Sequence, residues 1–235
     1  MPNVACAAQD SRPLADRIAS LFVAEVAVSV GCPDETGELF KEELCHIATS
    51  VESRRKEFAG GRRCARDALR KLDGPWTALP AARDRRPLWP EGYIGSISHC
   101  GDFCCAVAAR TYSATSLGID AEPATALPPE VAEMVCHTDE WRGVSGAPSC
   151  GWPKVVFVAK EAFYKAYYQA AYTFLDFSDV RIALRSLDPR TGAGAFQAEL
   201  VNADRPGPEV ARRIVGAWAV WEDKVFAGAT LLPTS

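Results

Sequence analysis

One pattern constrains the fold more than any other, because it occurs twice: a long amphipathic helix followed by short strands. In the first half, residues 38–72 carry a helical apolar stripe, and we expect a bend at Gly60-Gly61. In the second half, apolar residues from Val155 to Ala170 recur at steps of three, four and seven, which indicates another helix beginning near Pro153. This order predicts an α+β fold of two similar lobes, each a helix packed on an antiparallel sheet, with ligand between them.

Short apolar runs bounded by turn residues mark the strands. After a turn at 111–115, residues 116–119 begin a return strand, and a hairpin is expected around Glu222-Asp223. The connector at 124–152 is rich in Pro and Gly, with a short helix at 128–136, so we expect an N-terminal lobe at 1–123 and a C-terminal lobe at 124–235. The expected strands are 22–30, 103–110, 116–119, 180–187, 195–201, 214–222 and 224–232.

Charge and cysteine content narrow the functional classes. A net charge of −4 over 235 residues disfavours nucleic-acid binding. The nine cysteines are odd in number, lack a CxxC pair and include adjacent Cys104-Cys105, so we expect a reduced, cytoplasmic protein without a disulfide framework. No signal-peptide pattern and no run of 18 apolar residues is found, so we expect no membrane association.

The first predicted helix has a strongly basic face. This basic face is either an ordinary solvated helix face or a phosphate-binding surface, since several guanidinium groups on one side suit a phosphate monoester. Further cations follow in the loop at 76–86, namely Arg83, Arg85 and Arg86. The basic residues of the helix are Arg54, Arg55, Lys56, Arg62, Arg63, Arg66, Arg70 and Lys71.

Three further patterns offer polar chemistry. Residues 89–100 (WPEGYIGSISHC) are expected to form a turn-rich segment whose backbone N–H groups, hydroxyls and imidazole could cradle a pyrophosphate, unless the histidine is structural. Asp120 and Glu122 lie two apart on a strand and therefore face one side, either as a solvated strand end or as a site for Mg²⁺ or Mn²⁺. Glu161 and Lys165 lie one helical turn apart, as a surface ion pair or as two contacts to one ligand.

Four blocks in a fixed order resemble the 4′-phosphopantetheinyl transferases of the Sfp type. Together they cover about half of the chain, from residue 54 to 166. Ser98 stands where many relatives have Thr, and Arg83, Arg85 and Arg86 are the alternatives for a place in the loop often filled by Lys. The blocks are RRKEF with GRRCAR (54–58 and 61–66), WPEGYIGSISHC (89–100), GIDAE (118–122), and FVAKE with Lys165 (157–161 and 165).

The resemblance implies an enzyme that moves the 4′-phosphopantetheine arm of coenzyme A onto a serine of an apo acyl or peptidyl carrier protein, releasing adenosine 3′,5′-bisphosphate. It also implies a monomer of two α+β lobes related by a pseudo-twofold axis, with coenzyme A in the cleft between them. Which carriers are served, and whether acylated coenzyme A is accepted, is not indicated by the sequence.

The same resemblance assigns roles to individual residues. Asp120, Glu122 and Glu161 would bind Mg²⁺, with Mn²⁺ as the alternative. Glu161 would take the serine proton, directly or through a metal-bound water, and Lys165 would stabilise the leaving phosphate. The residues assigned to the coenzyme A phosphates are Ser98, His99, Lys160 and Lys165.

Two arginines are assigned to the 3′-phosphate by the resemblance, namely Arg54 and Arg62. In an unbroken helix, however, Arg55 lies seven residues from Arg62 and so nearly on the same face, which leaves Arg54 and Arg55 as alternatives.

Two other functional classes stay open at this stage. A non-catalytic module that binds coenzyme A or a carrier protein would have no need of three carboxylates. A metal-dependent phosphoesterase would want more metal ligands than three carboxylates and one histidine.

Overall fold

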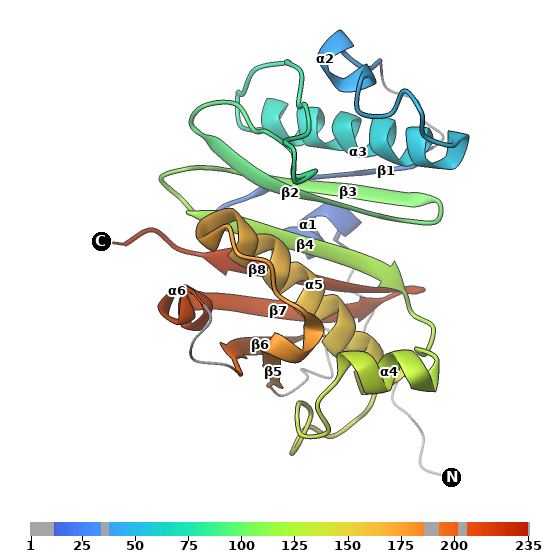
Figure 1. Cartoon of the computed structure of the whole chain (residues 1–235), viewed down its shortest axis with the longest axis vertical. Coiled ribbons are helices and arrows are strands. Elements are labelled where there is room, and N and C mark those ends of the chain that lie inside the picture. Colours follow the sequence, from blue (N-terminus) through green and yellow to red (C-terminus); the bar gives the residue numbers. More distant parts are fainter. Residues whose placement is uncertain (1–11, 34–37, 186–192, 202–205, 235) are drawn as a thin grey trace.

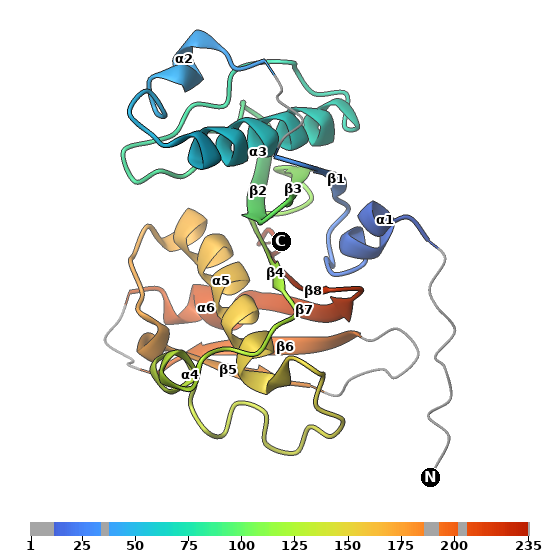
Figure 2. The same ribbon diagram turned by 90° about the vertical axis from the view of Figure 1, so that its right-hand side faces the viewer.

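The computed structural model describes residues 12–33, 38–185, 193–201 and 206–234. Its two antiparallel sheets each pack against one long helix, which confirms the predicted α+β class (Figures 1 and 2). None of the described helices is long and apolar enough to cross a membrane.

The N-terminal part is a three-stranded sheet, in the order β1-β3-β2, covered by α3. Small side chains of α3, such as Cys64, Ala65 and Ala68, pack against Ala106 and Ala108 of β3. The elements before and within this part are α1 (Leu14–Ala19), β1 (Ala27–Gly31), α2 (Lys41–Leu44), α3 (Glu52–Arg70), β2 (Tyr93–Cys100) and β3 (Phe103–Arg110).

The C-terminal part is a five-stranded sheet, in the order β4-β8-β7-β6-β5, on which α5 lies (Figure 2). The predicted hairpin around Glu222-Asp223 is confirmed, since β7 and β8 pair up to Trp221 and Lys224. The elements are β4 (Ser116–Pro123), α4 (Pro129–Val135), α5 (Gly151–Ala171), the short 3₁₀ helix η1 (Phe177–Asp179), β5 (Val180–Leu184), β6 (Ala193–Leu200), α6 (Pro208–Arg213), β7 (Ile214–Trp221) and β8 (Lys224–Leu231).

Two local expectations are wrong. The helix expected over 38–72 is interrupted at 45–51, between α2 and α3, and not at Gly60-Gly61. These glycines lie within α3 and serve close packing, since a Cβ at Gly60 would lie 2.7 Å from Cys104 Sγ. Residues 93–100 are also not turn-rich but form the regular strand β2, paired along its length with β3. Hydrogen bonding to β3 outweighs the weak strand propensity of glycine and serine in this segment.

The return strand at 116–119 belongs to the other sheet. Instead of pairing with β3, β4 pairs along its whole length with β8, from Ser116–Leu231 to Pro123–Lys224. The change of sheet therefore falls in the turn at 111–115, earlier than the expected lobe boundary at 123/124. A distant partner strand, more than 100 residues away, was not indicated by the local pattern.

The edges of the two sheets meet where β2 lies beside β4. Ile119 N donates to Ser96 Oγ (3.1 Å) and Ala121 N donates to Ser98 Oγ (3.2 Å). The register advances in the same direction on both strands, so β2 and β4 run parallel. Serine hydroxyls thus satisfy backbone N–H groups that a continuous sheet would have paired with carbonyls. We call this contact the seam.

Helix α5 approaches β4 closely enough that a glycine is required between them. A Cβ built on Gly118 would lie 1.8 Å from the carbonyl oxygen of Ala162. Ala162 is the residue after Glu161, so this contact sets the height of the α5 side chains above β4.

We expect Gly118→Ala to lower the free energy of unfolding by about 3 kcal/mol, because a backbone atom cannot move aside as a side chain can. Gly61→Ala is the control, since its new methyl group meets the Cγ2 methyl of Ile97, at 2.9 Å, and no backbone atom. It should change the free energy by less than about 1 kcal/mol. Urea denaturation of both variants measures this, and equal losses would contradict the proposed contact.

Candidate active site

Asp120 of β4 is the centre of a polar cluster at the seam. Its Oδ1 accepts hydrogen bonds from Ser98 Oγ (2.9 Å) and Lys165 Nζ (2.7 Å). Its Oδ2 is buried and has no hydrogen-bond partner in the described part of the chain. A buried carboxylate oxygen without a partner is unfavourable, so this atom is suited to a cation or another donor.

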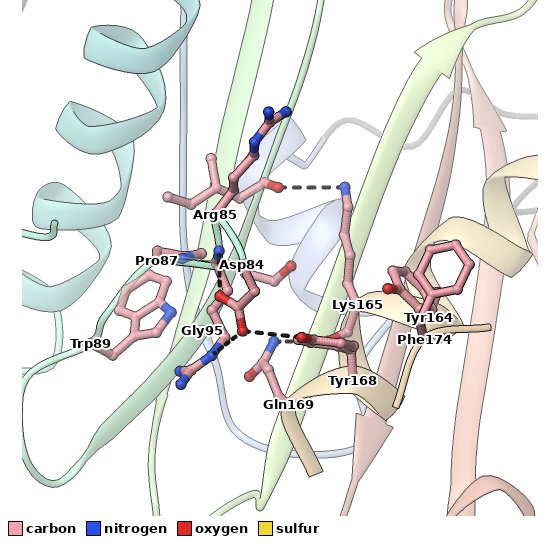
Figure 3. A pocket seen from close by; sticks show the side chains of 13 residues that line it. Asp84, Arg85, Pro87, Trp89, Gly95, Tyr164, Lys165, Tyr168, Gln169 and Phe174 are labelled. Carbon is pink, nitrogen blue, oxygen red and sulfur yellow. Dashed lines mark hydrogen bonds and ion pairs between the residues drawn. The ribbon is translucent and has the colours of Figure 1, made fainter. Parts of the chain in front are cut away.

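Lys165 of α5 reaches across both sheets at this point. Besides Asp120, its ammonium contacts Ile119 O of β4 (2.9 Å) and Ile97 O of β2 (3.5 Å), the latter drawn in Figure 3. Burial alone would lower the pKa of Lys165, but the carboxylates of Asp120 and Glu161 outweigh it and raise that pKa. Lys165 is therefore held charged at the seam.

Two further carboxylates belong to the same electrostatic environment. Burial, followed by the repulsion of Asp120, raises the pKa of both Glu122 and Glu161. Lys154 Nζ lies 3.6 Å from Glu122 Oε2 and offsets part of this. No three His, Cys, Asp or Glu side chains within the described ranges are already arranged to hold a metal ion. The three-carboxylate metal site accordingly stays a prediction.

His99 and Arg54 form a second polar pair next to this cluster. Arg54 Nη1 lies 2.9 Å from His99 Nε2, and Glu57 Oε2 lies 3.7 Å from His99 Nδ1. Because a guanidinium only donates, Nε2 must accept, which requires a neutral imidazole. Burial is the largest cause that lowers the pKa of His99, and Arg54 and Lys165 lower it further against the opposite effect of Glu57. His99 is therefore neutral at and above pH 7.

A cavity of about 500 Å³ opens beside Lys165, between the loop at 84–89, β2 and α5. Four aromatic side chains line it, Trp89 on one side and Tyr164, Tyr168 and Phe174 on the other, together with the charged Asp84, Arg85, Arg86 and Lys165 (Figure 3). Tyr168 OH donates to Asp84 Oδ2 (3.1 Å), which joins the loop to α5. We call this the aromatic cavity.

A second cavity, of about 640 Å³, lies against α3 and carries positive charge. Arg54, Arg83 and Arg85 line it, and Arg85 also lines the aromatic cavity. We call it the cationic cavity. Arg86 instead pairs with Asp84 Oδ2 (3.1 Å). Of the three loop arginines, Arg85 alone is placed to serve both cavities.

The structure distinguishes between Arg54 and Arg55. Arg55 donates to the carbonyls of Ser50 (2.9 Å) and Ala48 (2.7 Å) and so holds the loop before α3. Arg54 faces His99 and lines the cationic cavity. Arg54 is therefore the better candidate for a phosphate contact.

Other predicted phosphate ligands are engaged within the protein. The single hydroxyl proton of Ser98 goes to Asp120, so Ser98 holds that carboxylate here, and its contact with phosphate stays a prediction. Lys160 is 2% exposed and donates to Val135 O, Phe177 O and Glu140, which leaves no donor for a phosphate. Arg62 is 5% exposed, donates to Leu79 O and stacks on Phe58, so its assignment to the 3′-phosphate stays a prediction.

Several residues of the site were not singled out from the sequence. Ser96 lies two residues before Ser98 on β2, the spacing that puts its hydroxyl on the side of β4 as well. Tyr164 and Tyr168, one helical turn apart, could have been read as one aromatic stripe. Nothing in the sequence marks Asp84 or Glu140.

Comparisons with known proteins agree with this arrangement. The family model described as the 4′-phosphopantetheinyl transferase N-terminal domain matches residues 41–109, and that of the 4′-phosphopantetheinyl transferase superfamily matches residues 116–210. The two matches meet at the turn where the chain changes sheet.

Three similar proteins carry the same description. The 4′-phosphopantetheinyl transferase Svp of Streptomyces mobaraensis is 39% identical over 220 residues, covering 90% of this chain and 86% of that protein. Npt of Nocardia iowensis is 37% identical over 158 residues (66% and 71%), and PptT of Mycobacterium tuberculosis is 32% identical over 194 residues (81% and 85%). The chain thus belongs to the 4′-phosphopantetheinyl transferase family, and it is a transferase enzyme.

Proposed function

We propose that this enzyme transfers the phosphopantetheine arm of coenzyme A to a serine hydroxyl of an apo carrier protein and releases adenosine 3′,5′-bisphosphate. The observation that carries the proposal is the Lys165–Asp120 ion pair at the seam, with the aromatic and cationic cavities beside it. A pyrophosphate ester needs cations at its phosphates and an apolar channel for its pantetheine arm. The site offers both.

The two cavities suit the two ends of coenzyme A. In this proposal, the cationic cavity takes the adenosine 3′-phosphate, which Arg54 and Arg85 can bind through charge-assisted hydrogen bonds. The aromatic cavity takes the pantetheine arm, and Lys165 contacts the phosphates between them. His99 is neutral and accepts a hydrogen bond from Arg54. It therefore supports the phosphate contact of Arg54 by orienting the guanidinium and adds no charge of its own.

A divalent cation fits the donor set of the site. We propose that Asp120, Glu122 and Glu161 would hold Mg²⁺, with Mn²⁺ as the alternative, since carboxylate oxygens are the ligands that these ions prefer. The partnerless Oδ2 of Asp120 and the raised pKa values of the two glutamates support this assignment. When bound, Mg²⁺ neutralises charge on the pyrophosphate oxygens.

The residues themselves account for the proton and the leaving group. The serine oxygen bonds to the β-phosphorus while the bond from that phosphorus to the bridging oxygen breaks. Glu161, whose carboxylate lies close enough to Asp120 and Lys165 to interact with both, takes the serine proton, directly or through a water molecule. Lys165, charged and directed at the seam, stabilises the negative charge that develops on the departing bisphosphate.

We also infer a cytoplasmic monomer whose lobes are related by a pseudo-twofold axis. One long helix on one antiparallel sheet in each part supports the symmetry, although the sheets have three and five strands. Eight cysteines in the described part of the chain are free, which suits a reducing compartment.

Incubation of the protein with coenzyme A, Mg²⁺ and an apo carrier protein should add the mass of one phosphopantetheine unit to the carrier, as followed by mass spectrometry. Glu161→Gln should lower kcat by at least about 100-fold, because it removes the proton acceptor. Glu52→Gln, in the exposed first turn of α3, is the control. An unmodified carrier would indicate a binding module, and hydrolysis of coenzyme A without transfer would indicate a phosphoesterase.

Magnesium should stabilise the fold of the wild-type protein. At a concentration about 100-fold above its Kd, Mg²⁺ should raise Tm by about 5 °C, since it relieves the repulsion among three carboxylates. In the Asp120→Asn variant, the rise should be smaller than about 1 °C. Differential scanning calorimetry with and without EDTA tests this, and equal shifts in both proteins would remove Asp120 from the metal site.

Arg54→Ala should raise KM for coenzyme A about tenfold or more, while KM for 3′-dephospho-coenzyme A changes less than about twofold. Arg70→Ala, at the other end of α3 and paired with Asp67, should leave both constants unchanged. If Arg54→Ala affected both substrates equally, the 3′-phosphate would have to bind elsewhere.

A further inference from the structure

A buried ion pair involves Lys160, the residue before Glu161 in α5. Lys160 Nζ is 3.0 Å from Glu140 Oε1, and the two side chains are 2% and 0% exposed. Lys160 precedes Glu161 in α5, whereas Glu140 comes from the irregular connector after α4. Burying both charges away from water costs free energy, so packing alone does not explain why this pair is present.

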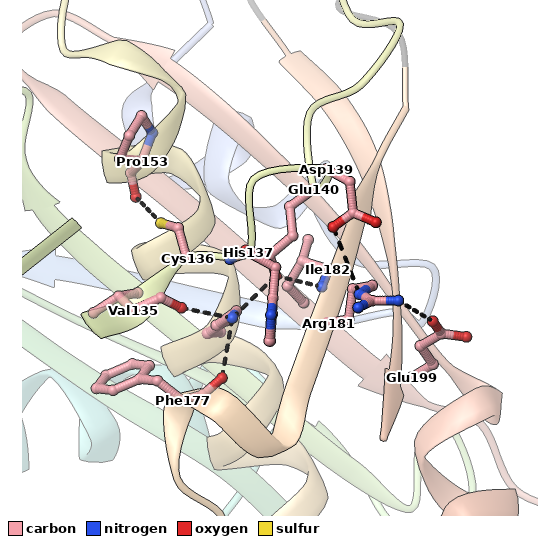
Figure 4. Close-up of polar contacts among 11 residues, drawn as sticks. Val135, Cys136, His137, Asp139, Glu140, Pro153, Phe177, Arg181, Ile182 and Glu199 are labelled. Carbon is pink, nitrogen blue, oxygen red and sulfur yellow. Dashed lines mark hydrogen bonds and ion pairs between the residues drawn. The ribbon is translucent and has the colours of Figure 1, made fainter. Parts of the chain in front are cut away.

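Glu140 fastens the connector to the edge strand of the large sheet. Its Oε1 accepts from Ile182 N (2.8 Å), and its backbone carbonyl accepts from Leu184 N (3.1 Å). Its Oε2 accepts from His137 N (2.7 Å), which also fixes the start of the connector (Figure 4). One glutamate thereby occupies two successive outward N–H groups of β5.

Lys160 fastens α5 to two other segments. Its ammonium donates to Val135 O, the last residue of α4 (2.7 Å), and to Phe177 O, the first residue of η1 (3.0 Å). Together with the Glu140 carboxylate, these acceptors use all three ammonium protons. Lys160 is thus the point where α4, the connector, η1 and α5 meet.

The segments joined in this way form a wall beside Glu161. A pocket of about 160 Å³ is lined by Lys160 and Glu161 together with Leu175, Phe177 and Val180. Phe177 is held through its carbonyl by Lys160, and Val180 begins the strand held by Glu140. The ion pair therefore connects the helix that carries Glu161 to the opposite wall of its pocket.

We propose that Glu140 and Lys160 are a positioning pair for Glu161, acting as one unit to fix α5 against η1 and β5 so that the Glu161 carboxylate stays directed at the seam. The inference rests on the proposed function, in which Glu161 takes the serine proton. It replaces the predicted contact of Lys160 with phosphate by a role that acts through its neighbour.

The test uses the neutral double variant Glu140→Gln/Lys160→Met in the full chain, which leaves no unpaired buried charge. We expect kcat for carrier modification to fall at least about tenfold, while KM and the calorimetric Kd for coenzyme A change less than about twofold. Each single substitution should lower kcat about as much as the double one, because the two residues act together. Amide hydrogen exchange at Ile182 should accelerate in all three variants.

The matched control is another deeply buried ion pair, Arg66 Nη1 to Glu43 Oε1 at 2.7 Å, which lies in the N-terminal part. Glu43→Gln/Arg66→Met should change Tm to a similar extent but leave kcat per folded molecule within about twofold. Glu140→Asp, which keeps both charges but withdraws the carboxylate by one methylene, provides a folded variant in which kcat should fall at least about threefold.

Three results would overturn the proposal. An unchanged kcat per folded molecule in the neutral double variant or in Glu140→Asp would leave only a structural role. A raised KM and Kd for coenzyme A with unchanged kcat would restore Lys160 as a phosphate ligand. Equal losses of kcat in the control pair would show a general effect of core stability. Failure of the wild-type protein to modify any apo carrier would instead refute the proposed function. The hydrogen exchange at Ile182 would still report on the positioning pair, through the hydrogen bond from Ile182 N to Glu140.

Discussion

The structure depends on a single junction, the seam where β2 and β4 lie parallel without forming a continuous sheet. Two serine hydroxyls take the place of the carbonyl acceptors there, and the Lys165 ammonium bonds to carbonyls of both strands. A polar junction of this kind leaves room for side chains between two sheet edges. Asp120 occupies that room, which explains how a carboxylate comes to be buried at the boundary of two otherwise apolar cores.

The electrostatics of the seam favour a charged ligand. Three carboxylates share a partly buried region, and the ammonium of Lys165 satisfies one oxygen of one of them. Burial, followed by the repulsion of Asp120, raises the pKa of Glu122 and Glu161. Raised carboxylate pKa values are expected at a site whose side chains are arranged to bind a ligand rather than to stabilise the fold. The pKa of His99 is perturbed in the same region. Burial is the largest cause that lowers it, so the imidazole beside Arg54 is neutral.

Local spacing was sufficient to predict the residues that point to one side of one element. Asp120 with Glu122 follows from the alternation of a strand, and Glu161 with Lys165 from one helical turn. What spacing could not supply is the identity of distant partners. Lys160 looked like a phosphate ligand because it neighbours Glu161, yet its acceptors come from residues 135, 140 and 177. The partner of β4 was wrongly expected for the same reason, because a partner strand near the end of the chain leaves no periodic trace. Nor does the hydrogen bond from Ser98 to Asp120, 22 residues away. The two long helices, the strands after α5 and the α+β class were predictable because amphipathic periodicity is a local property, whereas α6 and the break between α2 and α3 were not predicted.

The attachment of Glu140 to β5 has a consequence for solution behaviour. Strand β5 ends the five-stranded sheet, and an outer strand of this kind presents backbone donors that can recruit a strand from another molecule. Here the amides of Ile182 and Leu184 are already occupied by a side chain and a carbonyl of the same chain. The connector thereby acts as a protective cover against self-association through this border, and its loss would favour sheet-to-sheet aggregation at high concentration.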